Sequence, residues 1–352
     1  MKLNISKRLE SIIRRSEDEN EIILQLKQLI SEYEKQNNPA KISKTISELF
    51  AENIQDLQSN KKENNLIKSG FSKLDERIGG FMPGELIIIG GRPAMGKTQL
   101  LINICINIAK TIPVLYFTFD LSVDNLTKRF ISTLSNLAID KILQNSLSEI
   151  EKHHITAETK KLGELKLYIN DSCSNSISAF KELCIKQINE FGVKVILVDY
   201  LQMMGSDNIK NSRKSELNYI CRELKNVAKE FNVVVISLSH LSSAIERRTG
   251  LEGKKPMLSD LIGSDSIEKE ADKVIFIHRP EYYHLTEDCR GNSLVGIVEL
   301  IIAKNKAGTI GDVLLERDDD FTTFINFKRY LSDFKITRKR LNTKGDLPSN
   351  LN

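Results

Sequence analysis

The sequence predicts an α/β fold with a central, mainly parallel sheet, preceded by a short helical region. Through residues 66–327, short apolar runs rich in β-branched residues alternate with longer segments whose apolar residues recur at helical spacing. Such alternation is typical of strand–helix–strand units, in which helices cover both faces of a parallel sheet. Residues 1–64, by contrast, contain no glycine and show helical spacing. The last apolar runs follow one another closely, so we expect hairpins to complete the sheet.

Taken in chain order, four segments differ in composition. Residues 1–38 are predicted to form an amphipathic helical arm, and residues 39–65, after the break Asn37-Asn38-Pro39, a linker helix and a polar linker. Residues 66–327 are predicted to form the α/β domain, and residues 328–352 a basic, polar tail. The predicted strands are residues 86–89, 114–119, 167–169, 193–198, 233–238, 274–277, 297–302 and 313–315, and the predicted helices include residues 99–110, 178–191 and 215–231.

Length and composition exclude several classes of protein. The chain has 352 residues, of which 40% are hydrophobic and 28% charged, so a sizeable core is expected and wholesale disorder is excluded. Its 51 basic and 47 acidic residues give a net charge of +4, which neither requires nor excludes a nucleic-acid partner. The cysteines form no CxxC pair, which disfavours a zinc site and a disulfide framework. The sequence shows no signal-peptide pattern and no apolar run of about 20 residues, so we expect a cytoplasmic protein without a membrane partner.

The strongest functional signal is an eight-residue glycine-rich loop between a predicted strand and a predicted helix. It matches the pattern GxxxxGK[ST], in which backbone N–H groups and a helix N-terminus surround phosphate oxygens. A chance glycine turn is the alternative, and the flanking strand and helix argue against it. In this pattern the Lys97 ammonium reaches the β- and γ-phosphates and the Thr98 hydroxyl binds Mg²⁺. The predicted nucleotide-binding residues are Gly91, Arg92, Pro93, Ala94, Met95, Gly96, Lys97 and Thr98.

Polar side chains end three other predicted strands. Asp199 follows four apolar residues, a pattern typical of the carboxylate that holds Mg²⁺ together with the loop hydroxyl. Asp120 and His240 lie at the ends of two further strands, and the strand ends of an open α/β sheet meet at the ligand site. We therefore expect Asp120 to orient an attacking water and His240 to sense the γ-phosphate. For the two aspartates the alternative is a helix cap, and for His240 it is a structural role.

These segments resemble the motor domain of the DnaB-type replicative DNA helicases, which are RecA-like ATPases. The similarity runs from about residue 70 to residue 317, and several of its motifs are specific. The segments that carry it are residues 70–75, 79–80, 84–86, 91–98, 199–204, 222–225, 256–261 and 266–272. The resemblance implies a RecA-like fold and a homo-oligomeric ring, usually a hexamer, that encircles single-stranded DNA and binds ATP and Mg²⁺ between subunits. It also implies that Lys304 and Lys306 act on the ATP of the neighbouring subunit.

At four positions the sequence departs from that family's pattern. Asp120 replaces a glutamate, so the carboxylate retracts by about 1.5 Å, and a misplacement of this size costs on the order of 100-fold in rate. Lys306 replaces the arginine finger and lacks the planar fork of arginine. His240 replaces a glutamine, and residues 262–265 read Ile-Gly-Ser-Asp where the family has Arg-Glu-Ser-Gly. These changes indicate a diverged member in which ATP binding is better supported than hydrolysis or unwinding.

Two loops expected by this resemblance to face the ring channel carry cations that we predict to bind DNA phosphates: Lys210, Arg213, Lys214, Arg247, Arg248, Lys254 and Lys255. A solvated basic surface is the alternative for both loops. The helix in residues 39–65 resembles the family's linker helix. The residues before it are too few for the family's helical domain of about 100 residues, which argues against a primase partner and leaves a helicase loader open as a partner.

The function that these observations support best is an ATP-dependent, DnaB-like replicative DNA helicase. Two alternatives remain: a nucleotide-binding ring or scaffold that does not unwind, and another RecA-like ATPase of recombination or clock type. The departures at Asp120, Lys306 and residues 262–265 favour the first alternative. Residues 199–204 and 256–261 argue against the second.

Overall fold

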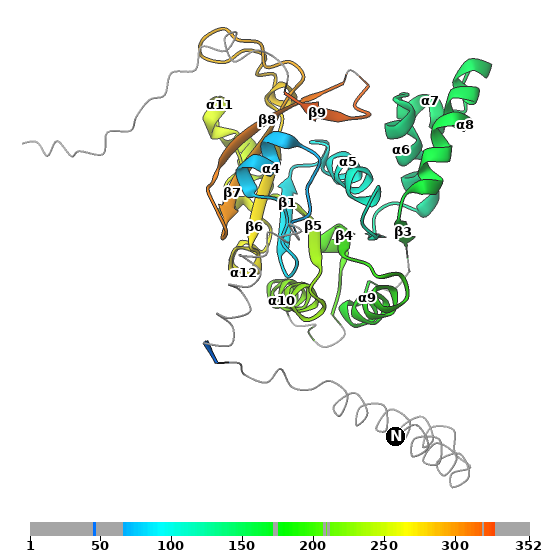
Figure 1. Ribbon diagram of the computed structural model, residues 1–352. Helices are drawn as coiled ribbons and strands as arrows, with labels where there is room; N and C mark the ends of the chain where they lie inside the picture. The colour runs from blue at the N-terminus through cyan, green and yellow to red at the C-terminus, as the bar shows by residue number, and fades with distance from the viewer. Residues whose placement is uncertain are drawn as a thin grey trace, which may run out of the picture. The chain divides into compact units, whose positions relative to one another are not determined.

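The computed structural model describes residues 45–46, 66–171, 175–206, 209, 212–318 and 320–327 (Figure 1). The predicted helical arm, almost all of the linker and the basic tail lie outside these residues, so the division of the chain into four segments stays a prediction. Among the described residues, no helix combines the length and the apolar character needed to cross a bilayer.

Nine strands of the described residues form one sheet, in the order β3-β2-β4-β5-β1-β6-β7-β8-β9. Neighbouring strands are parallel from β3 to β6 and antiparallel from β6 to β9. The sheet confirms the predicted α/β fold, in which hairpins complete a mainly parallel sheet. The strands are β1 (Leu86–Gly91), β2 (Val114–Thr118), β3 (Leu167–Asn170), β4 (Val195–Asp199), β5 (Val234–His240), β6 (Lys273–His278), β7 (Ile297–Asn305), β8 (Gly311–Arg317) and β9 (Phe324–Asn326).

Helices cover both faces of this sheet (Figure 1). The α-helices of the described residues are α4 (Ser72–Ile78), α5 (Lys97–Ala109), α6 (Val123–Ser135), α7 (Ile139–Leu143), α8 (Glu149–Glu164), α9 (Ile177–Phe191), α10 (Arg213–Phe231), α11 (Gly250–Gly253) and α12 (Ser264–Glu270). Four short 3₁₀ helices in the same part of the chain are η1 (Leu201–Met203), η2 (Ser243–Arg247), η3 (Leu258–Asp260) and η4 (Pro280–Tyr283).

The apolar core has two halves because successive strand residues point to opposite faces of the sheet. In β1, Ile87 and Ile89 pack against residues of α4, α5 and α6. Leu86 and Ile88 pack on the other face, with residues of α9, α10 and α12. A strand that is covered on both faces needs apolar residues at consecutive positions, which explains the uninterrupted apolar run before the glycine-rich loop.

Residues between β2 and β3 fold into three helices, none of which was among the helices named from the sequence. Ser122 is the N-cap of α6, and its hydroxyl accepts a hydrogen bond from the backbone N–H of Asn125 at 3.3 Å. The later helix α8 has no fully buried residue, although Ser148 and Glu151 form a capping box at its start. Figure 1 shows α7 and α8 beside α6, at the side of the domain. Without a buried stripe, α8 lacked the apolar periodicity that predicted the other long helices.

Candidate nucleotide-binding site

The glycine-rich loop connects the end of β1 to the start of α5, as its sequence pattern predicts. Gly96 is the N-cap of α5 and has φ 91°, a left-handed conformation that favours glycine. At Gly91 the limit is space, since a Cβ atom there would lie 2.7 Å from Ile277 Cγ2 and 3.1 Å from Lys97 Cγ. The loop therefore ends in the N-terminus of a 13-residue helix, whose free N–H groups and dipole favour an anion.

Lys97 occupies the first position of α5 and is buried. Its Nζ donates a hydrogen bond to the Arg92 carbonyl, 3.0 Å away across the loop. Burial lowers the pKa of Lys97 to about 8, against the opposing effect of the Asp199 carboxylate. The ammonium is therefore charged at pH 7 and ready to contact a phosphate.

The lowered pKa of Lys97 predicts a pH dependence of nucleotide use. Because the group is cationic below its pKa, the charge is present at pH 7 and is lost as the pH rises through about 8. We expect kcat/KM for ATP, which reports the free protein, to fall about tenfold per pH unit above that value. Phosphate release measured from pH 6.5 to 9.5 checks this, and Lys97→Arg, whose side chain does not titrate there, should remove the alkaline fall. A kcat/KM that stays level up to pH 9.5 in the wild type would contradict it.

Asp199, at the end of β4, faces the loop hydroxyl. Its Oδ2 accepts hydrogen bonds from Thr98 Oγ1 at 2.9 Å and from the Tyr116 hydroxyl at 3.1 Å. Burial raises the pKa of Asp199, and these two hydrogen bonds act in the opposite direction. The carboxylate thus contacts the threonine of the phosphate loop and does not cap a helix. A carboxylate and a threonine hydroxyl are oxygen ligands of the kind that Mg²⁺ takes beside a phosphate, so this pair fits the metal.

The ends of β2, β4 and β5 meet the loop around a cavity of about 300 Å³. Asp120 is exposed at this cavity, two residues after the end of β2, and the cap of the following helix is Ser122 instead. His240 ends β5, and its ring stands edge-on to Tyr200 with centroids 4.3 Å apart. Burial lowers the pKa of His240 to about 4, and the Lys97 charge adds to this effect, so the imidazole is neutral at pH 7. The lining residues are Pro93, Ala94, Gly96, Lys97, Thr98, Gln99, Asp120, Leu121, Arg129, Asp199, Tyr200 and His240.

Three polar residues of this lining, Gln99, Arg129 and Tyr200, were missed by sequence reasoning. Arg129 comes from α6 and Gln99 from the first turn of α5. Gln99 directly follows the motif, so its position was a usable signal. Arg129 had none, because its neighbour Lys128 is also a cation of α6, and only the packing of that helix decides which of the two faces the cavity.

Three residues of the loop motif do not line the cavity. Met95 is buried in the apolar core, and Gly91 lies in β1. The Arg92 guanidinium turns to Glu246 Oε1, with donor distances of 2.9 and 2.7 Å, and to the Leu241 carbonyl at 2.7 Å. The Arg92 side chain therefore contacts Glu246 and the Leu241 carbonyl and does not line the cavity.

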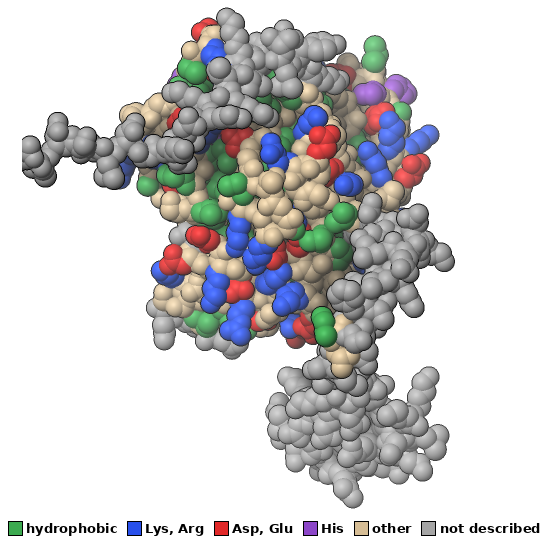
Figure 2. Space-filling model, turned by 60° about the vertical axis from the view of Figure 1, so that its left-hand side comes forward, with side chains coloured by type: hydrophobic (Ala, Val, Ile, Leu, Met, Phe, Trp, Pro, Cys, Tyr) green, Lys and Arg blue, Asp and Glu red, His purple; other side chains and the backbone are tan. Residues whose placement is uncertain are grey.

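Lys304 and Lys306 lie on β7 and just after it, away from the phosphate loop of their own chain. Lys304 Nζ donates to the Glu268 carbonyl of α12, and Lys306 Nζ donates to Asp272 Oδ1 at 3.0 Å. In Figure 2 the side of the molecule that carries β7 and α12 in Figure 1 is turned forward, and Lys and Arg side chains mix there with Asp and Glu. Lys306 is exposed, and Lys304 is half-buried at the surface beside α12.

Most of the predicted DNA-binding cations already have partners. Lys210 lies outside the described residues, and Arg247 is exposed. Arg213 donates to the carbonyls of Gln202 and Met204, at 2.7 and 3.0 Å. The remaining pairs are Lys214 with Asp265 at 2.5 Å, Arg248 with Asp260 at 2.6 Å, Lys254 with the Glu246 carbonyl at 2.8 Å and Lys255 with Asp312 at 3.2 Å.

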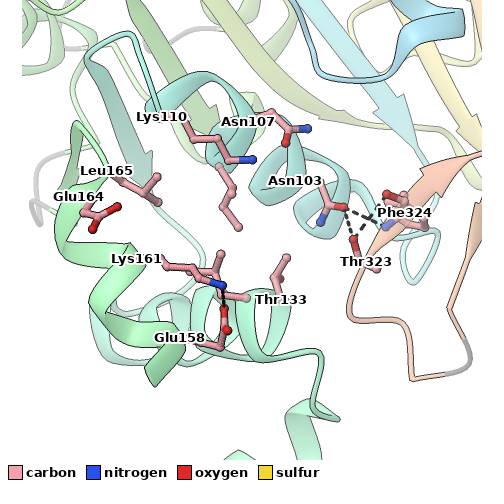
Figure 3. Close-up of a pocket in the computed structure, with 12 residues that line it drawn as sticks. Asn103, Asn107, Lys110, Thr133, Glu158, Lys161, Glu164, Leu165, Thr323 and Phe324 are labelled. Carbon is pink, nitrogen blue, oxygen red and sulfur yellow. Dashed lines mark hydrogen bonds and ion pairs between the residues drawn. The ribbon is translucent and has the colours of Figure 1, made fainter. Parts of the chain in front are cut away.

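A larger cavity, of about 510 Å³, lies between α5, α6, α8 and the chain before β9 (Figure 3). No residue of the glycine-rich loop lines it, and its charged residues include the ion pair of Lys161 with Glu158 at 2.5 Å. On one wall, Asn103 Oδ1 accepts hydrogen bonds from Thr323 Oγ1 at 2.9 Å and from the Phe324 N–H at 2.8 Å. This cavity has neither the glycine-rich loop nor the free N–H groups of a helix N-terminus, which hold phosphates, so the smaller cavity is the candidate site.

Comparisons with known proteins agree with this geometry. The model of the DnaB-like helicase C terminal domain matches residues 67–326. The replicative DNA helicase DnaC of Bacillus subtilis is 34% identical over 285 residues, which cover 80% of this chain and 61% of the relative. For the replicative DNA helicase DnaB of Geobacillus stearothermophilus the identity is 34% over 288 residues, covering 81% and 62%. The chain thus spans about three fifths of the length of these curated relatives.

Two solved structures share the fold. One is an ATPase domain with a TM-score of 0.72 and 27% identity, and the match covers 81% of this chain and 100% of that domain. The other is a DnaB-like replicative helicase, studied with its interactions with primase. It has a TM-score of 0.75 and 24% identity, and the match covers 93% of this chain and 75% of that one.

Proposed function

The chain belongs to the family of the DnaB-like helicase C-terminal domain, and from that premise we propose that it is an ATP-dependent replicative DNA helicase. It would hydrolyse ATP at subunit interfaces, move along single-stranded DNA and separate the strands of a duplex. The observation that carries the proposal is the hydrogen bond of Thr98 with Asp199 beside Lys97, which unites two separate motifs at one cavity.

Several residues at this cavity have roles in the proposed reaction. The loop N–H groups and Lys97 would bind the β- and γ-phosphates, and Thr98 and Asp199 would hold Mg²⁺, which neutralises phosphate charge when bound. Asp120 would orient the attacking water, and the neutral His240 would contact the γ-phosphate as a hydrogen-bonding group. Arg129 adds a second cation to the lining, which suits the charge of the phosphates.

Lys304 and Lys306 fit the role of cations that act on a neighbouring subunit. They are absent from the residues that line the cavity of their own chain, and their side chains lie at the surface next to α12. We therefore propose a homo-oligomeric ring, with a hexamer as the expected size, in which ATP lies between subunits. Single-stranded DNA would pass through this ring, and the protein would work in the cytoplasm, where ATP and DNA are both present.

One observation favours the alternative of a nucleotide-binding ring or scaffold that does not unwind. The segment that departs from the family pattern brings Asp265 to within 2.5 Å of Lys214, which places an anion beside a cation that was predicted to bind DNA. Strand displacement on forked DNA separates the two functions. ATP-dependent unwinding that Lys97→Ala abolishes supports the helicase, whereas nucleotide binding without strand separation supports the scaffold.

The shortened carboxylate at position 120 predicts that this chain hydrolyses ATP slowly and that Asp120→Glu accelerates it. A glutamate extends the carboxylate toward the cavity by about 1.5 Å, and corrections of this size change rates by up to about 100-fold. We expect DNA-stimulated phosphate release to rise in the variant, while the affinity for ATP stays the same. Asp124→Glu, on the exposed first turn of α6, is the matched control and should leave turnover unchanged. Turnover that falls in Asp120→Glu would show that the backbone has already adapted to aspartate.

A further inference from the structure

Arg92 belongs to the phosphate loop by sequence, but its side chain joins that loop to the chain that follows β5. Nε and Nη2 donate to Glu246 Oε1, and Nη1 donates to the Leu241 carbonyl. Every nitrogen of the guanidinium therefore has a partner in one short stretch of chain. The neighbouring residue before that stretch is His240, which lines the nucleotide cavity.

The two ends of the stretch from Leu241 to Ile262, here called the clamp segment, are paired with each other. Leu241 forms a β-bridge with Leu261, and the backbone N–H of Ser242 donates to the Asp260 carbonyl at 2.8 Å. At its end the Ile262 N–H donates to the His240 carbonyl at 3.3 Å. The two ends of the clamp segment thus adjoin the end of β5, and Arg92 links the first half of the segment to the phosphate loop. Four of the predicted DNA-binding cations belong to this segment: Arg247, Arg248, Lys254 and Lys255.

The ion pair between Arg92 and Glu246 is open to competition from another anion. The Glu246 side chain is 44% exposed, and exposed ion pairs are weak because water screens them. The Arg92 charge also reaches the cavity. Burial is the main cause of the low pKa values of Lys97 and His240, and the positive charge of Arg92 contributes to both. Arg92 also lies next to the predicted phosphate-binding lysine, because its carbonyl accepts a hydrogen bond from Lys97 Nζ at 3.0 Å. A polyphosphate bound by Lys97 would therefore bring several negative charges near the Arg92 guanidinium.

We infer that Arg92 is a positioning residue that couples nucleotide occupancy to the clamp segment. Bound nucleotide draws the guanidinium away from Glu246, and the first half of the segment loosens. The inference rests on the proposed nucleotide site and adds a route from that site to the DNA-binding cations. Because such coupling is reciprocal, DNA that pulls the segment away from Glu246 strengthens nucleotide binding by the same factor.

Hydrogen–deuterium exchange of the backbone amides of residues 243–257, read by mass spectrometry, tests this coupling. With Mg²⁺ and a non-hydrolysable ATP analogue, we expect exchange in the wild type to accelerate by about fivefold, the lower end of typical coupling. In Glu246→Gln, exchange should be fast with and without the analogue. Arg92→Lys keeps the charge but loses the planar fork of the guanidinium, so it should show the same fast exchange as is expected of Glu246→Gln. It supplies the test if Glu246→Gln does not fold.

Glu252→Gln is the matched control, because Glu252 is an acid of the same segment, 83% exposed, and 3.6 Å from Lys255. It should keep the wild-type response to the analogue. Calorimetry on the same samples measures whether the analogue binds, and absence of binding in the wild type would overturn the nucleotide site itself. Binding with unchanged or slower exchange, or a wild-type response in Glu246→Gln, would overturn the coupling alone. If the ion pair of Arg92 with Glu246 were merely structural, exchange would be faster in Glu246→Gln, but the ratio of the exchange rates with and without the analogue would stay as in the wild type.

Discussion

Lys97→Ala is expected to lower ATP turnover by at least about 100-fold, because it removes a positioned cation from the site where phosphate charge develops. The side chain is buried at the N-terminus of α5, beside Asp199 and Thr98, so water cannot replace its charge in the same place. Nine other residues of α5 are buried, which keeps the helix in place when the Lys97 side chain is shortened. The measurement is steady-state phosphate release, with and without single-stranded DNA, together with calorimetry using Mg²⁺ and nucleotide.

Lys110→Ala is the matched control, since Lys110 is an exposed lysine at the other end of the same helix. It should keep turnover within about twofold, as substitutions at exposed sites change little. If Lys97→Ala released phosphate at the wild-type rate, the cavity described here would not be the site of hydrolysis.

Lys306→Ala is expected to lower turnover on the order of 1000-fold while leaving nucleotide binding nearly unchanged, which is the pattern of a cation supplied by a neighbouring subunit. The residue does not line the cavity of its own chain, so its loss cannot weaken binding there directly. The fold should also survive, because its partner Asp272 keeps Lys225 at 2.5 Å and the backbone N–H of Leu86 at 2.8 Å. Turnover and nucleotide affinity measured side by side check both parts.

Mixing two inactive variants tests whether the cation acts between subunits. A ring assembled from Lys97→Ala and Lys306→Ala chains contains some interfaces with both lysines intact, so partial turnover should return. Lys269→Ala, which removes an exposed cation of the nearby helix α12, is the control and should retain turnover. Full activity of Lys306→Ala alone, or no recovery in rings proven to be mixed, would argue against action in trans.

The sheet and the phosphate loop were predictable because their signals are local. The runs at residues 86–89 and 195–198, which became most of β1 and β4, are continuously apolar, which a strand buried on both faces requires. The glycine-rich loop has its pattern in eight consecutive residues, and the structure sets it between a strand and a helix as expected. The apolar pattern did not predict α8 or β9. Helix α8 has no fully buried residue, and strand β9 is only three residues long.

Side-chain direction was the part of the site that sequence could not supply. A sequence motif gives the order of residues but not the direction of their side chains. Arg92, for example, turns toward Glu246, which lies 154 positions further along the chain. In the same way, the partners of Lys214 and Arg248 depend on how loops fold back, and Arg129 faces the cavity because of the packing of α6. Contacts between distant parts of the chain decide all three, and no local pattern records them.

Phe324, in the last described strand, stands directly behind the phosphate loop. A Cβ atom at Gly96 would lie 2.9 Å from Phe324 Cζ, and the carbonyl of Thr322 accepts a hydrogen bond from Gln99 at 2.5 Å. The hairpin of β8 and β9 thus packs behind the phosphate loop and supports the first turn of α5. A shortened form that ended before Thr322 would keep every sequence motif and still lose this support. The part of the chain needed for function therefore extends well beyond its last recognisable motif.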